Sequence, residues 1–165
     1  MKDYESFYQS ITQPYLDKRR RQGLLLLNKL LTAIMYLAYP ALLIFLFVTN
    51  RHSLMKNIFI PGLSFFGLSL FRHILNSPRP YECYCIKPLI YKETHGHSFP
   101  SRHVFSSAMI AMCYFYQNAF LGIILLLMTV IEGYIRVVGG VHFIKDVVAG
   151  MLIGIGCGLL LLLWI

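Results

Sequence analysis

Long apolar runs separated by short polar segments dominate the chain. The runs cover residues 24–48, 54–75, 101–116, 119–138 and 143–165. A helix of about 20 apolar residues crosses a hydrocarbon core of about 30 Å, and a helix satisfies its own backbone hydrogen bonds in lipid. The pattern therefore predicts an all-α fold, a polytopic transmembrane helix bundle with about five spanning helices.

Residues 1–22 precede the first run and have a different pattern. Aromatic residues recur there at roughly helical spacing, and a basic cluster, Lys18 to Arg21, follows them. Aromatic and basic side chains suit the headgroup layer of a membrane, so we predict an amphipathic, basic lead-in at the interface. The chain shows no internal repeat or separate soluble segment, and we interpret residues 1–165 as a single domain.

Five crossings would sort the polar segments between the two membrane faces. The N-terminus, the loop 76–99 and the turn 136–146 fall on one face, and the turns 49–53 and 117–118 fall on the other. The basic cluster predicts a cytoplasmic N-terminus by the positive-inside rule. The unusual polar residues are thus expected to gather at a single face of the membrane.

Composition agrees with a membrane location. The chain is 57% hydrophobic and 13% charged, whereas soluble domains are nearer a quarter charged. Lys and Arg number 15 against 7 Asp and Glu, which suits anionic lipid surfaces or substrates. Nucleic acid is a poor partner because the chain between the basic residues is long and apolar. We expect a multi-pass protein of the cell membrane whose partner is the lipid bilayer, and no protein partner is indicated.

Three polar segments at the predicted common face carry the candidate chemistry. Residues 72–80 hold two arginines seven positions apart. Residues 100–103 begin a helix, where free N–H groups and a partial positive charge suit an anion. Residues 136–146 pair a histidine with an aspartate four positions later, on one face if a helix begins there. The candidate residues are Arg72, Arg79, Ser101, His103, Arg136, His142 and Asp146.

These residue types suit phosphoryl transfer without a metal. Arginine matches phosphate oxygens with its planar fork of donors and stabilises their charge in the transition state. One neutral histidine can attack phosphorus while a second protonates the leaving oxygen. The carboxylate partner Asp146 favours His142 as the nucleophile. Free acidic ligands are scarce on this face, so we expect neither a metal nor another cofactor.

Taken together, the three segments resemble the signature motifs of the type-2 phosphatidic acid phosphatase family. These are integral-membrane lipid phosphatases that share an active-site plan with vanadium haloperoxidases. The family motifs are Lys, six residues, Arg-Pro; then Pro-Ser-Gly-His; then Ser-Arg, five residues, His, three residues, Asp. The matching positions here are Arg72 and Arg79-Pro80, Pro100 to His103, and Ile135-Arg136 with His142 and Asp146. The resemblance runs from about residue 58 to the C-terminus.

The resemblance implies a role for each matching residue. His142 resembles the nucleophile that forms a phosphohistidine, Asp146 its orienting partner, and His103 the general acid. Arg79, Arg136 and Ser101 resemble the phosphate ligands, Arg72 stands where the family has a lysine, and Arg102 is a further candidate phosphate-binding residue. Three positions depart from the pattern: Arg72 replaces lysine, Arg102 replaces glycine and adds a cation beside the site, and Ile135 replaces serine.

The resemblance implies a metal-independent phosphatase acting on a lipid phosphate or diphosphate. Undecaprenyl diphosphate, phosphatidylglycerophosphate and phosphatidic acid are the expected substrate types. Two other functions use the same residues: a non-catalytic membrane protein that binds anionic lipid, and a lipid phosphotransferase. Binding alone explains the arginines, but it does not explain a His–Asp pair beside a second histidine at a helix start. The resemblance implies that the active site lies on the outer face of the membrane. The positive-inside rule implies the opposite, since it places the N-terminus and the site in the cytoplasm.

Overall fold

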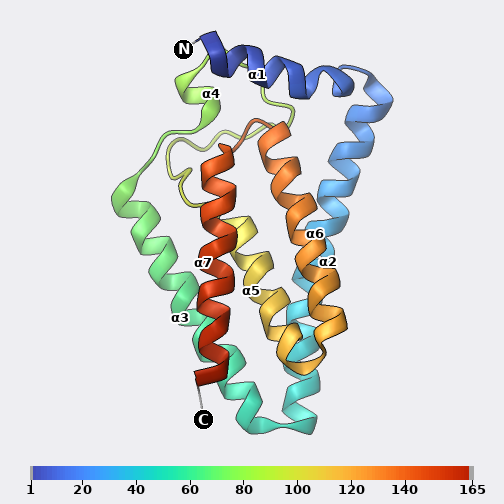
Figure 1. The fold of residues 1–165 in the computed structure, drawn as a ribbon, viewed down its shortest axis with the longest axis vertical. Helices are drawn as coiled ribbons and strands as arrows, with labels where there is room; N and C mark the ends of the chain where they lie inside the picture. The colour runs from blue at the N-terminus through green and yellow to red at the C-terminus, as the bar shows by residue number, and fades with distance from the viewer. Residues whose placement is uncertain (1, 164–165) are drawn as a thin grey trace.

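A computed structural model describes residues 2–163 and shows an all-α protein (Figure 1). Met1 of the predicted lead-in and residues 164–165 of the last predicted helix lie outside the described residues. The elements are α1 (Lys2–Thr12), the 3-10 helix η1 (Gln13–Tyr15), α2 (Lys18–Thr49), α3 (Arg51–Leu75), α4 (Pro80–Cys83), α5 (Arg102–Gln117), α6 (Ala119–Val138) and α7 (Ile144–Leu163).

Asparagine and aspartate side chains fix where the long helices begin. The Asn50 side chain accepts a hydrogen bond from the Ser53 amide at 3.0 Å, and the Asn118 side chain accepts one from the Leu121 amide at 3.1 Å. Such caps satisfy amides that the first helical turn leaves free. Because these two connections are very short, α2 and α3 form one antiparallel pair and α5 and α6 form another (Figure 1).

The first long helix begins earlier than the apolar run predicts. Asp17 accepts a hydrogen bond from the Arg20 amide at 3.1 Å, so α2 begins at Lys18 and the basic cluster occupies its first turns. The predicted lead-in is therefore divided into α1, η1 and the start of α2. Hydropathy alone placed the boundary too late because the basic turns are helical but not apolar.

The prediction of five spanning helices is wrong, because within residues 2–163 four segments are long and apolar enough to cross a membrane. They are Lys18–Thr49, Arg51–Cys83, Ala119–Val138 and Ile144–Leu163. The run predicted as the third span forms α5, which has 16 residues. At a rise of 1.5 Å per residue it is about 24 Å long, short of a core of about 30 Å.

The interior position of α5 explains its apolar sequence. It packs mainly against α6 and α7 and lies behind them in Figure 1. Half of its residues are buried: Val104, Phe105, Ser107, Ala108, Met109, Ala111, Met112 and Cys113. The apolar run at 101–116 is thus a protein core rather than a lipid-facing span.

A stripe of glycines lets α7 approach α5 closely, as the four-residue spacing predicts. A Cβ at Gly150 would lie 2.5 Å from the Ser101 carbonyl oxygen, and one at Gly154 would lie 2.7 Å from that of Phe105. Gly156, on another face of the helix, has nothing within 4 Å of its Cβ position. The stripe therefore keeps α7 close to the start of α5.

This packing makes Gly154→Ala destabilising. The new methyl group would meet the Phe105 carbonyl and the Ala108 side chain, and overpacking typically costs about 1–3 kcal/mol. Gly156→Ala is the matched control, since its methyl group enters open space. In thermal unfolding in detergent, Gly154→Ala should melt below Gly156→Ala. Equal melting temperatures for the two variants would contradict close α5–α7 packing.

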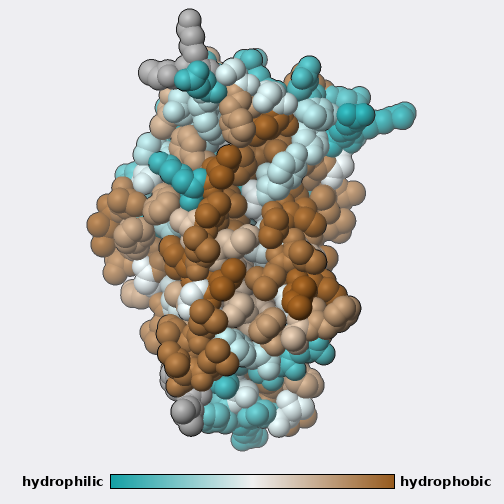
Figure 2. All heavy atoms as spheres, viewed as in Figure 1, coloured by the Kyte–Doolittle hydropathy of each residue, from teal (hydrophilic) through white to brown (hydrophobic). Residues whose placement is uncertain are grey.

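The surface has the distribution expected of a multi-pass membrane protein. Hydrophobic residues form a broad band over the middle of the visible face, and hydrophilic residues gather at the two ends (Figure 2). Helix α1 lies across one end of the bundle (Figure 1). There the Tyr8 hydroxyl lies 3.2 Å from the Val138 carbonyl oxygen, and Glu5 accepts a hydrogen bond from the Cys85 amide at 3.0 Å. These contacts attach α1 to the end of α6 and to the loop that precedes α5.

Candidate active site

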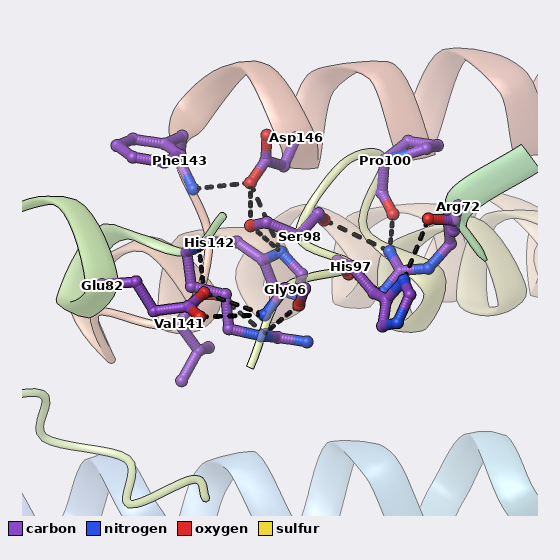
Figure 3. A network of polar contacts seen from close by, with 11 residues as sticks. Arg72, Glu82, Gly96, His97, Ser98, Pro100, Val141, His142, Phe143 and Asp146 are labelled. Atoms are coloured by element: carbon purple, nitrogen blue, oxygen red, sulfur yellow. Dashed lines mark hydrogen bonds and ion pairs between the residues drawn. The ribbon is translucent and has the colours of Figure 1, made fainter. Parts of the chain in front are cut away.

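The three polar segments meet at the end of the bundle that α1 covers. Arg72 lies in the last turn of α3, Pro100 precedes α5, and the turn containing His142 joins α6 to α7. Gly140 in that turn has φ +74°, a conformation that glycine adopts without strain. The turn returns the chain sharply, so that His142 lies beside the segment before α5 (Figure 3).

His142 is oriented by two side chains. Its Nδ1 lies 3.5 Å from Asp146 Oδ2 and 3.3 Å from Ser98 Oγ, and Ser98 donates to Asp146 Oδ2 at 2.5 Å (Figure 3). Asp146 Oδ2 also accepts from the Phe143 amide at 3.0 Å. Within residues 2–163, Nε2 of His142 makes no hydrogen bond, and the ring lines a cavity. A carboxylate at Nδ1 favours the tautomer whose Nε2 lone pair is free.

The predicted His–Asp pair is therefore close in space, but sequence reasoning missed Ser98. This serine is fully buried and lies 44 positions before His142. It comes from the irregular end of the 76–99 loop, where no helical or strand period relates it to the pair. Nothing in the local sequence distinguished it from the other polar residues of that loop.

Ser98→Ala is expected to lower kcat about tenfold. The change removes a hydrogen bond to a carboxylate, worth about 1.5–3 kcal/mol, and frees Asp146 to turn away from His142. Phosphate release at saturating substrate measures the effect, and Ser10→Ala on the exposed face of α1 is the matched control. Unchanged kcat in Ser98→Ala would show that Ser98 does not position the pair.

Arg72 and Arg79 are held by backbone carbonyls rather than by carboxylates. Arg72 donates to the carbonyl of Ser98 at 3.2 Å and also to those of His97 and Pro100. Arg79 donates to Gly96 and Val141 carbonyls at 3.0 Å each. Neutral partners hold the two guanidinium groups in place, and neither forms an ion pair with a carboxylate of the described residues; Figure 3 shows Arg72 among its carbonyl partners.

A cavity of about 290 Å³ opens beside these groups. Its lining includes the two candidate catalytic histidines and four cations: His103, His142, Arg72, Arg79, Lys92 and Arg102. Among the described residues, no carboxylate lines it. Burial, with Arg79 and Arg136 nearby, lowers the pKa of Lys92 to about 8. Sequence reasoning missed Lys92 because a lone loop lysine carries no motif.

Both histidines are neutral in the unliganded site. Burial lowers the pKa of His142 to about 4, against the opposing effect of Asp146. Burial also lowers the pKa of His103 to about 3, and the Arg136 and Lys92 charges add to this. A neutral imidazole at position 142 is a nucleophile at neutral pH. An anion bound among the cations would oppose their effect and raise the proton affinity of His103.

Ser101 and Arg136 are not among the residues that line this cavity. Ser101 is fully buried, its amide donates to the Asp146 carbonyl at 2.8 Å, and its Oγ has no partner. Arg136 lines a cleft whose other residues come mainly from α2, and its Nη2 lies 3.8 Å from Oε1 of Glu132, one turn earlier on α6. In the part of the chain that the structure describes, no three His, Cys, Asp or Glu side chains cluster as metal ligands would.

An apolar path begins at the same site. A cavity of about 330 Å³ is lined by Arg102 and His103, by further polar residues such as Thr32 and Glu132, and by apolar residues such as Met35, Phe65 and Ile110. A second cavity of about 240 Å³ shares Phe65 and Ile110 and extends to further residues, Pro61, Phe105 and Met109. A cationic compartment thus adjoins an apolar groove between α2, α3 and α5.

Comparisons with known proteins agree with this arrangement. The model of the PAP2 superfamily matches residues 41–165. The crystal structure of Aquifex aeolicus LpxE is similar, with a TM-score of 0.71 and 28% identity over 95% of this chain and 93% of that one. No curated protein matches the chain.

A second solved structure shares the fold. It is that of the first transmembrane PAP2 type phosphatidylglycerolphosphate phosphatase from Bacillus subtilis, with a TM-score of 0.68 and 20% identity, covering 98% of this chain and 85% of that one. The family match spans most of the chain and includes all three polar segments. The chain therefore belongs to the PAP2 superfamily, as a multi-pass membrane lipid phosphatase.

Proposed function

We propose that this enzyme hydrolyses a lipid phosphate or diphosphate through a phosphohistidine at His142, without a metal. Undecaprenyl diphosphate, phosphatidylglycerophosphate and phosphatidic acid are the candidate substrates. One observation carries the proposal: Nδ1 of His142 faces Asp146 and Ser98, while the ring shares a cationic cavity with His103. An anionic-lipid carrier would need the cations but not this arrangement of two histidines.

In the proposed first step, the cations hold the substrate phosphate while Nε2 of His142 attacks phosphorus. The N–P bond forms as the bond from phosphorus to the lipid oxygen breaks, and His103 gives that oxygen a proton. His103 acquires this proton when the anionic substrate enters. Arg72, Arg79 and Arg136 offset the charge on the equatorial oxygens, and Ser101 is assigned to the same phosphate-binding group.

In the proposed second step, water attacks the phosphohistidine. His103, neutral after the first step, accepts a proton from the water, and the N–P bond breaks to release inorganic phosphate. Asp146 stabilises the imidazolium character of His142 in both steps. The apolar groove between α2, α3 and α5 would hold the lipid tail, since it adjoins both Arg102 and His103.

Purified enzyme incubated with the three candidate lipids in excess chelator tests the proposed function. We expect inorganic phosphate from at least one of them, because arginines rather than a metal offset the phosphate charge. Binding without phosphate release would instead support a non-catalytic lipid-binding protein. Transfer to an added alcohol without free phosphate would identify a phosphotransferase, and full loss of activity in chelator would contradict the metal-independent mechanism.

A further inference from the structure

A polar cleft lies between α2 and α6, beside the cationic cavity. Its volume is about 360 Å³, and its lining includes Asn28, Lys29, Thr32, Tyr36, His103 and Arg136. The first four residues lie on α2, which is strongly apolar beyond its basic first turns. Polar side chains within membrane-spanning helices are costly and usually serve a function. A groove that held only the apolar lipid tail would not need these polar side chains.

Two buried polar atoms, each on a residue that lines this cleft, have no partner among the described residues. They are Oδ1 of Asn28, an acceptor, and Nε of Arg136, a donor whose residue is 6% exposed. Thr32 donates its hydroxyl hydrogen to Glu132 at 3.2 Å, so its oxygen can still accept. Buried polar groups are rarely left unpaired. A hydroxyl group can supply both missing partners, whereas an ester or a phosphate offers acceptors only.

The position of His103 relates the cleft to the reaction. His103 lines the cationic cavity, the apolar groove and the cleft. If it protonates the leaving oxygen, the part of the lipid next to that oxygen lies beside His103. The cleft also shares Thr32 and Tyr36 with the groove. A headgroup in the cleft could thus remain connected to a tail in the groove.

We propose that this cleft binds a hydroxyl group on the lipid headgroup next to the scissile phosphate, with Asn28 as a specificity-determining residue. The substrate would then be a phosphorylated glycerol or sugar lipid with a free hydroxyl, rather than a polyprenyl phosphate. This inference rests on the proposed function. Asn28 lies before residues 41–165, which the family model matches.

Two lipids that differ by one hydroxyl test the inference: 1-oleoylglycerol 3-phosphate and its 2-deoxy analogue. We expect kcat/KM to be at least about tenfold higher for the hydroxyl compound, because leaving buried polar groups unpaired costs about 1–3 kcal/mol. Asn28→Leu should lower kcat/KM for the hydroxyl compound and bring the ratio close to one. The ratio compares kcat/KM for two lipids in one preparation of enzyme. A misfolded fraction lowers both values equally and therefore leaves the ratio unchanged.

Leu30→Asn is the matched control, since it places an amide on the exposed side of the same helix. Leu30→Asn should keep the wild-type ratio of kcat/KM for the two lipids. Equal kcat/KM for the two lipids in the wild type, or an unchanged ratio in Asn28→Leu, would overturn the inference and leave the proposed function intact. Release of no phosphate from either compound or from the three candidate lipids would overturn the proposed function itself.

Discussion

Replacing His142 with alanine is expected to lower kcat by about 10⁴-fold or more, as removal of a nucleophile does in enzymes that form covalent intermediates. Its ring is 2% exposed and lines the cationic cavity. Asp146 and Ser98 hold the ring in place. Neither the carboxylate nor the serine hydroxyl, which donates to that carboxylate, can take the place of the attacking nitrogen. Phosphate release from the best lipid of the panel, measured over hours, would record the loss.

The control for this variant is His52→Ala. His52 is exposed in the first turn of α3, at the end of the bundle opposite the site. The His52→Ala variant should retain wild-type kcat. A melting temperature near that of the wild type would show that His142→Ala is folded. More than a few per cent of wild-type activity in folded His142→Ala would exclude His142 as the nucleophile.

Replacing His103 with alanine is expected to lower kcat by about 10²–10⁴-fold for an alkyl phosphate. An alkoxide is a poor leaving group, so the reaction needs a proton at the leaving oxygen. The nitrophenolate group of p-nitrophenyl phosphate leaves without needing a proton. The loss for that substrate should therefore be much smaller, provided that phosphohistidine formation limits the rate. Comparing kcat for the two substrates in the wild type and the variant separates acid catalysis from a structural effect.

Equal losses for the two substrates would contradict the role of His103 as general acid. Such a result would point instead to damage to the cavity, because the ring also borders the apolar groove and the α2–α6 cleft. His73→Ala is a useful second control. His73 is a histidine of the same cavity, stacked against His97 with ring centroids 5.4 Å apart, and has no assigned proton transfer.

The location of the site could be predicted from sequence because it follows from simple geometry. Apolar runs that cross the bundle in alternating directions bring every second connection to the same end, and the three polar segments occupy such connections. His142 and Asp146 are separated by four positions, and although α7 begins only at Ile144, its first turn places Asp146 beside His142 in the preceding turn. The distance of 3.5 Å between His142 Nδ1 and Asp146 Oδ2 agrees with the predicted proximity of the pair.

Contacts made by irregular segments could not be predicted in this way. Ser98 and Lys92 lie in the long loop, where no period relates a residue to its distant neighbours. Arg136 was grouped with the other arginines by motif, yet the structure turns it toward α2 and Glu132. The length of α5 was misjudged for a related reason: an apolar helix inside a protein has the same composition as one that faces lipid.

Trapping the covalent intermediate tests the central claim most directly. Wild-type enzyme mixed with its best substrate is quenched in alkali, which preserves phosphohistidine, and its peptides are analysed by mass spectrometry. We predict one phosphoryl group on His142 during turnover, absent from His142→Ala and from enzyme without substrate. A phosphoryl group on another residue, or rapid-quench turnover with a free His142 at every time point, would contradict the account.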